Sequence, residues 1–233
     1  VYERSPYAGA LVFAAFSGSH QDAIAKGMKW REEKQLHRWT VPYIPVDPKD
    51  IGRTYDADVI RINSQSGKGG IGYLLEQTYG YILPGKMREH LGYTVKSVSD
   101  HAHKELSAPE VRDVFEKTYL NKTSPFKLVD VSFIQKKEFF AVVTLETGGQ
   151  QREFSGTGNG RLDAVANAIQ SGTGMEFSID TYTQHALEQG STSRAISYVG
   201  LKWDSGTVTW GAGTDTDVMT ASVKALISAI NNK

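Results

Sequence analysis

The stretch GGQQREFSGTGNGRLDAVANAIQ, residues 148–170, contains the elements that decide the fold. Its Gly-Gly pair stands between two strand-like runs, FFAVVTLET and QQREFSGTG, which is typical of a β-hairpin. Three glycines, Gly156, Gly158 and Gly160, then permit a tight turn from strand into helix. The helix that follows places its apolar residues on one face: Leu162, Val165, Ala166 and Ile169.

The same order of elements returns nearer the C-terminus. The run ISYVGLKWDSGTVTWGAG, residues 196–213, predicts two strands around a Ser-Gly turn and ends in Gly-x-Gly. A helix over DVMTASVKALISAINN, residues 217–232, follows it. Two β-β-glycine turn-helix units therefore predict a pseudo-twofold α+β domain over residues 125–233, with the helices on one face of the sheets.

Residues 1 to about 125 are predicted to be mostly helical. Ser19 with Asp22 forms a capping-box pattern that opens one helix. A second helix covers GGIGYLLEQTYG and ends at Gly80. A third begins at the pair Ser107 and Glu110. Its apolar face comprises Val111, Val114, Phe115 and Tyr119.

Two connections separate these predicted helices. The run VPYIPVDPKDIG, residues 41–52, contains three prolines and is predicted to be extended, because proline cannot continue a helix interior. The run DADVIRINSQ, residues 56–65, predicts a short strand. A change of texture near Ser124 and Pro125 marks the expected start of the last domain.

Composition excludes several classes of protein. Apolar residues make up 39% of the 233 residues, which excludes a disordered chain. The 26 basic and 26 acidic residues balance, so no global field favours nucleic acid or an anionic membrane. The absence of cysteine excludes disulfides, thiolate metal sites and thiol nucleophiles. The chain does not begin with Met, and we expect it to be a piece of a longer protein.

Three motifs resemble ligand sites but favour a structural interpretation. In NSQSGKGG, residues 63–70, the glycine after Lys68 breaks the phosphate-loop pattern. In GTGNGR, Arg161 occupies the place of the third glycine of a dinucleotide site. His101 and His103 have a spacing that metal ligands adopt on a strand, but on a helix they point apart, and a solvated helix surface is favoured.

His20 is a candidate for proton transfer. It lies just inside a predicted helix start, where the helix dipole disfavours a protonated ring, and neutral imidazole at an exposed turn suits general acid–base chemistry. The alternative is an ordinary surface histidine, because no neighbouring residue completes a catalytic site.

Together these residues resemble the region after the catalytic barrel in the 2-isopropylmalate synthase family. The segments YAGALVFAAFSGSHQDAIAKGMKW, VPYIPVDPKDIGRTY and IRINSQSGKGGIGYLL resemble its linker subdomains. The segments FSGTGNGRLDAVANAI and WGAGTDTDVMTASVKALISAIN resemble its C-terminal leucine-sensing domain. The resemblance implies linker subdomains over residues 1–62 and 63–124, and a regulatory domain over residues 125–233.

The resemblance also implies an activity for the parent enzyme. That enzyme condenses acetyl-CoA, 2-oxoisovalerate and water to 2-isopropylmalate and CoA, the first committed step of leucine biosynthesis. Its (β/α)8 barrel binds a divalent metal, Mg, Mn or Zn, whereas this chain lacks the barrel and is expected to bind no cofactor and to be inactive alone. L-leucine as allosteric inhibitor, a homodimer and a cytoplasmic location are implied, with no nucleic-acid or membrane partner.

Site residues follow from the resemblance, position by position. His20 and Tyr43 correspond to linker residues that reach the partner subunit's barrel. The leucine site has a glycine turn and a facing wall: Gly158, Asn159, Gly160, Leu162, Ile179, Tyr182, Ala186 and Ser193. Gln184 departs from the family's usual carboxylate, and Ser193 stands where a small apolar residue is common; both bear on the strength of leucine binding.

Three other interpretations remain open from the sequence. The sister enzyme citramalate synthase, sensed by isoleucine, shares the GSHQDAI and RINSQSGKGG segments loosely. A free-standing amino-acid-binding or dimerisation module would never have been joined to a barrel. A metal hydrolase would use His101 and His103.

Overall fold

The computed structural model describes residues 5, 9, 12–13, 18–53, 68–103, 106–135, 137–188, 190 and 193–233. The strand expected over residues 56–65 and most of the glycine-rich run at 63–70 lie outside the described residues. The chain divides into two compact units, Val1–Val114 and Phe115–Lys233. This division falls ahead of the boundary expected near Ser124 and Pro125, and each unit is described by itself.

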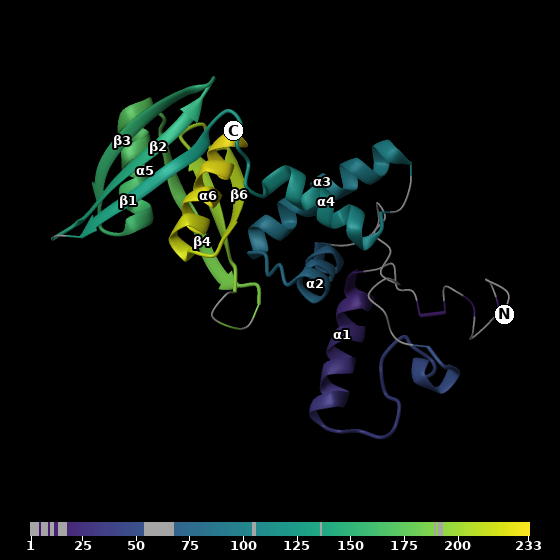
Figure 1. Ribbon diagram of the computed structural model, residues 1–233. Coiled ribbons are helices and arrows are strands. Elements are labelled where there is room, and N and C mark those ends of the chain that lie inside the picture. The colour runs from purple at the N-terminus through teal and green to yellow at the C-terminus, as the bar shows by residue number, and fades with distance from the viewer. Residues whose placement is uncertain are drawn as a thin grey trace. The chain divides into compact units, whose positions relative to one another are not determined.

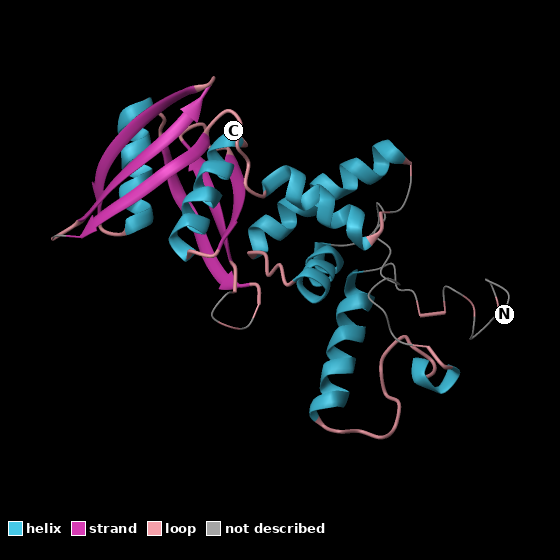
Figure 2. Ribbon diagram, in the orientation of Figure 1, coloured by secondary structure: helices cyan, strands magenta, loops and turns pink. Residues whose placement is uncertain are grey.

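The described part of the first unit is helical, as the sequence predicts (Figures 1 and 2). Its elements are α1 (Gly18–Glu33), the 3-10 turn η1 (Pro48–Ile51), α2 (Lys68–Tyr79), α3 (Gly85–Ala102) and the start of α4 (Ala108–Tyr119). Only the end of α3, around His101, was predicted to be helical, although the buried residues of the whole helix recur every four positions: Met87, Leu91, Val95 and Ser99.

Local signals fix the ends of these helices. Gly80, at φ 71°, takes the left-handed conformation after α2, so the predicted helix end is confirmed. The capping box that opens α4 is confirmed through its carboxylate half, because the Ser107 N–H donates to Glu110 Oε2 over 2.9 Å. The first helix begins at Gly18, one residue before the expected cap Ser19, which therefore lies in its first turn.

The proline-rich connection after α1 is extended only in part. Residues 48–51 form the turn η1, because Asp47 accepts a hydrogen bond from the Lys49 N–H and Pro48 occupies the first position. Gly52 ends the turn at φ 67°. The prediction of an extended segment over the whole of residues 41–52 is therefore wrong at residues 48–51, and also at Tyr43, which lies in a turn with φ 63°.

The second unit contains two sheets, each followed by a helix (Figure 1). The first half contains β1 (Lys127–Gln135), β2 (Phe139–Thr147), β3 (Gln150–Gly158) and α5 (Arg161–Thr173). The second contains β4 (Phe177–Ala186), β5 (Ala195–Trp203), β6 (Val208–Asp215) and α6 (Val218–Asn231). Both sheets are antiparallel, with strand orders β1-β2-β3 and β4-β5-β6.

The predicted α+β class is confirmed, and the repeating unit is corrected. The unit is β-β-β-α in both halves, since β1 precedes the predicted hairpin of the first half and β4 precedes that of the second. Of these two strands, β4 was not predicted. The Gly-Gly hairpin is confirmed, since Gly148 and Gly149, at φ 56° and 77°, form the turn between β2 and β3.

Glycines in the third strand of each half let a helix approach closely. A Cβ on Gly156 would lie 2.5 Å from the Ala168 N of α5. On β6, a Cβ on Gly211 would collide with the backbone of α6 at Ala229. The glycines of the GTG and GAG motifs therefore serve helix–sheet packing, and the predicted pseudo-twofold repeat extends to this detail.

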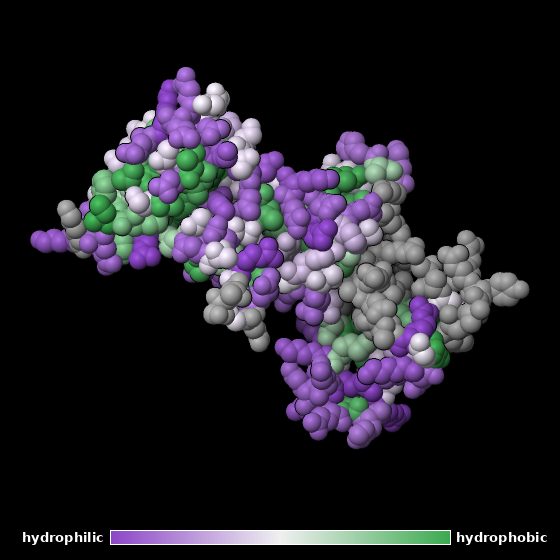
Figure 3. Space-filling model, viewed as in Figure 1, coloured by the Kyte–Doolittle hydropathy of each residue, from purple (hydrophilic) through white to green (hydrophobic). Residues whose placement is uncertain are grey.

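One hydrophobic core joins both halves of the second unit. Buried residues of β2, β5, α5 and α6 form a single cluster, with Val143, Val165, Leu201 and Leu226 fully buried in it. The opposite face of the first sheet exposes apolar side chains, among them Ile134, and Figure 3 shows hydrophobic surface over this sheet. A pocket of about 650 Å³ there is lined by Ile134, Lys137, Glu138, Phe140 and Thr157.

The chain that enters the second unit pairs with the outer edge of β6. Leu120 forms a parallel bridge with Ala212, and the Asn121 N–H donates to the Ala212 carbonyl over 2.9 Å. The Asn121 side chain adds two bonds to Thr214, one to its hydroxyl and one from its N–H. Residues 120–121 therefore cover an edge that the sheet order would leave open.

Candidate functional site

The structure brings the two candidate catalytic residues of the linker together. His20 is exposed in the first turn of α1, and Tyr43 is 64% exposed in the loop that follows the helix. Their ring centroids lie 4.2 Å apart, with an angle of 30° between the ring planes. Tyr43 has φ 63°, a left-handed backbone that is uncommon for a residue with a side chain.

Contacts within the loop explain how Tyr43 is held opposite His20. The Trp39 Nε1–H donates to the Ile44 carbonyl over 2.7 Å, across the turn that contains Tyr43. Arg31 of α1 forms a partly buried ion pair with Asp47 at 3.2 Å, and its guanidinium lies 5.0 Å from the Trp39 ring centroid. The loop is therefore fastened to the last turn of α1 on both sides of Tyr43.

The glycine-turn residues of the expected leucine site lie where β3 passes into α5. Gly158 is buried at the end of β3, Gly160 is the N-cap of α5, and Leu162 packs into the core. Gly160 is extended at φ −138° and offers no side-chain cap. Instead, the Asn159 N–H donates to Asp163 Oδ2 over 2.9 Å.

Asp163 is a residue of this turn that the sequence reasoning missed. Its carboxylate is exposed in the first turn of α5, where the helix dipole favours an anion. The signal was present, because an acidic residue three positions after a glycine N-cap is a helix-start pattern. The turn therefore presents a carboxylate to solvent beside the Asn159 side chain.

The wall residues of the expected site lie on β4 and in the loop after it. Ile179 is half-buried against the core, Tyr182 is 39% exposed, and Ala186 is the last residue of β4. Ser193 fastens the loop, since its hydroxyl donates to the Glu188 carbonyl and accepts from the Glu188 N–H. The structure thus gives Ser193 a role in holding the wall's C-terminal end.

Tyr182 is joined to α6 by a cluster of hydroxyl groups. Its Oη lies 2.8 Å from Ser222 Oγ and donates to Gln184 Oε1 over 2.7 Å. Ser222 Oγ lies 3.0 Å from Ser197 Oγ of β5, and both serines are fully buried. The sequence reasoning did not single out either serine, although each interrupts an apolar run.

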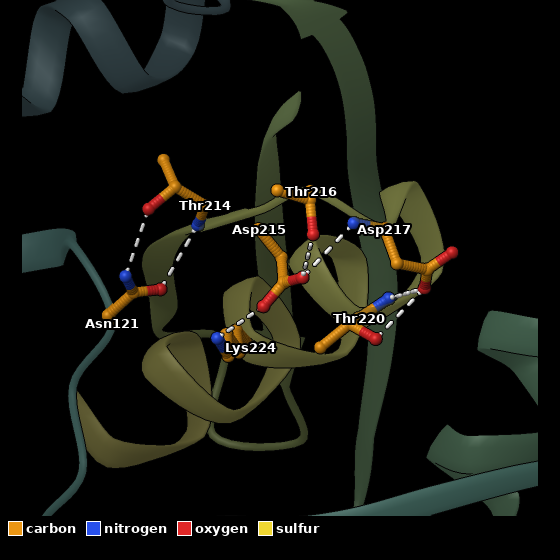
Figure 4. A network of polar contacts seen from close by, with 7 residues as sticks. All are labelled: Asn121, Thr214, Asp215, Thr216, Asp217, Thr220 and Lys224. Carbon is orange, nitrogen blue, oxygen red and sulfur yellow. Dashed lines mark hydrogen bonds and ion pairs between the residues drawn. The ribbon is translucent and has the colours of Figure 1, made fainter. Parts of the chain in front are cut away.

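A polar network fixes the N-terminus of α6 (Figure 4). Asp217 caps the helix by accepting from the Thr220 N–H over 2.7 Å. Asp215 accepts from Lys224 Nζ over 2.6 Å and from the Asp217 N–H over 3.0 Å. Figure 4 also shows Asn121 bound to Thr214, on the strand that leads into this turn.

The environment of Asp215 favours its ionised form. Burial alone would raise the pKa of this carboxyl group. Four interactions of the carboxylate together outweigh burial and lower its pKa. They are the hydrogen bond from Lys224, the hydrogen bond from the Asp217 N–H, the positive charge of Lys224 and the hydrogen bond from the Thr216 hydroxyl. The carboxylate and the lysine therefore hold the first two turns of α6 against the end of β6.

His101 and His103 lie on the exposed surface at the C-terminal end of α3. His101 is exposed, and its Nδ1 lies 2.7 Å from the Ser97 carbonyl of the preceding turn. His103 is the exposed residue that ends α3 in the left-handed conformation. Within the residues that the structure describes, no three His, Asp or Glu side chains are grouped as metal ligands would be.

The described helices contain no segment with the length and apolar character that a membrane crossing requires.

Comparisons with known proteins match this architecture to a family. A family model described as "Alpha-isopropylmalate synthase, post-catalytic domain-like" matches residues 10–76. A second, described as "LeuA allosteric (dimerisation) domain", matches residues 105–233.

Relatives with a shared name align along almost the whole chain. The 2-isopropylmalate synthase of Desulfitobacterium hafniense is 58% identical over 231 residues, covering 99% of this chain and 42% of that protein. The Helicobacter hepaticus protein of the same name is 49% identical, covering 99% and 43% respectively. The Rhodospirillum rubrum protein is 38% identical, covering 100% and 42%.

This chain thus spans about two fifths of the length of these relatives. Its two matched regions follow one another in the order post-catalytic, then allosteric. The chain belongs to the 2-isopropylmalate synthase family, of which it carries the post-catalytic region and the LeuA allosteric (dimerisation) domain.

Proposed function

We propose that this chain is the regulatory part of a cytoplasmic, homodimeric 2-isopropylmalate synthase and that it binds L-leucine as a feedback inhibitor. The observation that carries the proposal is the match of residues 105–233 to an allosteric domain, in a chain whose relatives are named 2-isopropylmalate synthase. The parent enzyme would join acetyl-CoA, 2-oxoisovalerate and water to 2-isopropylmalate and CoA.

The divalent metal of that reaction is assigned to the barrel in the rest of the parent enzyme. The described residues of this chain do not group three ligand side chains in one place. The chain alone is therefore expected to be inactive.

His20 and Tyr43 are assigned to the partner subunit's active site. Stacking on Tyr43 restrains the imidazole plane of His20 while both rings remain exposed, which suits a group that must meet a substrate held elsewhere. Two side chains that are already in contact lose less conformational entropy on docking than two independent side chains.

Leucine is proposed to bind between the α5 turn and the β4 wall. Asp163 and the Asn159 amide oxygen would accept from its ammonium, and Leu162 and Ile179 would contact its isobutyl group. Asp163 was not among the residues expected from the sequence. Its carboxylate supplies the negative charge that pairs with an ammonium group. Tyr182 would close the wall with its exposed ring.

Inhibition requires that leucine bind one arrangement of the parent dimer better than another. A coupling free energy of about 1–3 kcal/mol between the leucine site and the active site would give feedback of ordinary strength. Both β-β-β-α halves contribute to one hydrophobic core, so a shift of α5 or α6 changes the packing of the other helix.

A thermal-shift titration of this chain with leucine, isoleucine and valine tests the proposal. Ligand at 100 times its Kd stabilises by about 2.7 kcal/mol, which corresponds to a rise in Tm of roughly 5–10 °C for a domain of this size. A rise that saturates at the lowest concentration for leucine is expected. Preference for isoleucine would contradict leucine sensing, and so would no shift with any of the three.

The division of labour within the parent enzyme is tested by His20→Ala. Turnover is expected to fall by about 100-fold or more, as for loss of a general acid or base, while the Kd for leucine stays unchanged. Leucine binding that falls while turnover holds would overturn this assignment.

A further inference from the structure

The hydroxyl groups of Ser197, Ser222 and Tyr182 and the side-chain amide of Gln184 form a continuous chain of hydrogen-bonding contacts. Each hydroxyl has one proton to donate, whereas the amide oxygen of Gln184 is an acceptor only. The Tyr182 hydroxyl donates to Gln184 Oε1 over 2.7 Å, its oxygen lies 2.8 Å from Ser222 Oγ, and Ser222 Oγ lies 3.0 Å from Ser197 Oγ. We call these four residues the hydroxyl relay.

Ser222 is the centre of the relay and also touches its own helix. Its Oγ lies 2.8 Å from the Val218 carbonyl, in the first turn of α6. Its hydroxyl is fully buried, whereas the Tyr182 ring remains partly exposed at the other end of the bond. The relay therefore connects a residue on the surface of β4 to a buried position in the second turn of α6.

The first half of the domain contains side chains without hydroxyl groups at the equivalent positions. Ala141 lies opposite Gly156 in the first sheet, and Val199 lies opposite Gly211 in the second. Because these two glycines begin the GTG and GAG motifs, Ala141 corresponds to Val199. Phe133 of β1 lies opposite Ala141, and Tyr182 of β4 lies opposite Val199. Phe133 therefore corresponds to Tyr182.

Two further positions follow from the same comparison. Phe139, opposite Gly158, corresponds to Ser197, opposite Gly213. A Cβ on Gly156 would meet Ala164 and Ala168 of α5, and one on Gly211 would meet Ala225 and Ala229 of α6. Ser222 therefore corresponds to Arg161, whose guanidinium lies 5.9 Å from the Phe133 ring centroid and 5.7 Å from that of Phe139. Two phenylalanines and an arginine of one half thus occupy the places of three hydroxyl residues in the other.

This difference shows that the fold itself does not require the relay. The β1–β3 half holds these positions with two phenylalanine rings and the Arg161 guanidinium over them, without a hydroxyl group, and burying a hydroxyl costs free energy unless it is hydrogen-bonded. A hydroxyl cluster present in only one of two equivalent halves indicates a role beyond packing.

We propose that Ser222 is a positioning residue that holds Tyr182 in the wall of the effector site and thereby ties that wall to the first turn of α6. This inference rests on the proposed function, since it concerns the same leucine site. When leucine contacts the Tyr182 ring, the relay passes the resulting restraint to α6, whose N-terminus is fixed by Asp217 and by the pair of Asp215 with Lys224.

The test is isothermal titration calorimetry of L-leucine with the 233-residue chain and four variants. Tyr182→Phe and Ser222→Ala each break the relay and leave no large cavity, and their double variant completes a cycle. Ser228→Ala is the matched control, because Ser228 is also a fully buried α6 serine, and it accepts from the Lys122 N–H over 2.9 Å.

Each relay variant is expected to weaken leucine binding about threefold to tenfold, the equivalent of one ordinary hydrogen bond. The double variant should bind about as weakly as either single variant, because all three lack the same connection. Ser228→Ala should lower the Tm of the ligand-free chain as Ser222→Ala does, without changing the leucine Kd.

Several outcomes would overturn the inference. Unchanged leucine affinity in Ser222→Ala, multiplicative losses in the double variant, or an equal loss in Ser228→Ala would each remove the positioning role while the unchanged chain still binds leucine. Absence of leucine binding by the unchanged chain would instead overturn the proposed function, and the inference with it.

Discussion

The imidazole of His20 and the phenol of Tyr43 lie in contact, with ring centroids 4.2 Å apart, on two segments that the sequence separates by a whole helix and a loop. The contact depends on the loop, which returns to α1 through the Arg31–Asp47 ion pair and the Trp39 bond to Ile44. A left-handed Tyr43 is the backbone cost of presenting the ring there.

Replacing Tyr43 by Leu should move the NMR resonances of the His20 ring protons towards the positions of a free histidine, because the ring current of the phenol is lost. Tyr43→Phe should leave them nearly unchanged. Tyr93→Leu, which removes a tyrosine of equal exposure (63%) from α3, is the control. Unchanged His20 ring-proton resonances in Tyr43→Leu would show that the two rings do not stack in solution.

Gly156→Ser should lower the free energy of unfolding by about 1–3 kcal/mol or more, because the new Cβ would lie 2.5 Å from the Ala168 N. Gly160→Ser, at the N-cap of α5, is the matched control. Its Cβ would meet nothing within 4 Å, and serine is a favoured N-cap, so stability should hold or rise slightly. Urea unfolding of both variants gives the comparison, and equal losses would refute the close-packing role.

Lys224→Met should make the second unit more sensitive to acid. The pKa of Asp215 lies below its ordinary value of 3.8, so its carboxylate stabilises the fold above that pH and the stabilisation is lost as the pH falls through the lowered pKa. Without Lys224 the pKa should rise, and the acid limb of unfolding should begin at higher pH.

The loss at pH 7 is expected to be about 1 kcal/mol, because the ion pair is partly exposed. Urea unfolding between pH 3 and pH 7 measures it, with Lys202→Met, an exposed lysine of β5, as control. An acid limb identical to that of the unchanged chain would contradict the role given to Lys224.

Gln184→Glu should strengthen the bond from the Tyr182 hydroxyl, because hydrogen bonds to a carboxylate are roughly twice as strong as those to an amide. The exposed position limits the gain in unfolding free energy at pH 7 to about 1 kcal/mol. The gain should vanish once acid protonates the new carboxylate. Gln135→Glu, at the equivalent place of β1, should show no such gain; equal effects at both positions would count against the relay.

The repeat was predictable because its signals are local. A Gly-Gly turn between apolar runs and a glycine-rich bend before an amphipathic helix each follow from a few neighbouring residues. Strand β4 escaped prediction for the opposite reason. It is a sheet-edge strand whose residues are mostly exposed, such as Asp180 and Thr183, so it lacks the apolar alternation that identifies a strand.

The candidate site was only partly predictable. His20 and Tyr43 could be singled out, but their contact depends on a left-handed turn that the sequence VPYIP does not specify. Ser197 and Ser222 come from a strand and a helix whose pairing requires the tertiary fold. The assignment of leucine-site residues stays a prediction, since it came from resemblance and awaits a binding measurement.

The bond network of Asn121 has a practical consequence for anyone who isolates the second unit. Because Leu120 and Asn121 pair with β6, a chain cut at Pro125 would leave the backbone donors and acceptors of that edge unpaired. An open strand edge is a template for other chains, and such a truncated protein is expected to aggregate through β6 where a chain that keeps α4 stays dispersed.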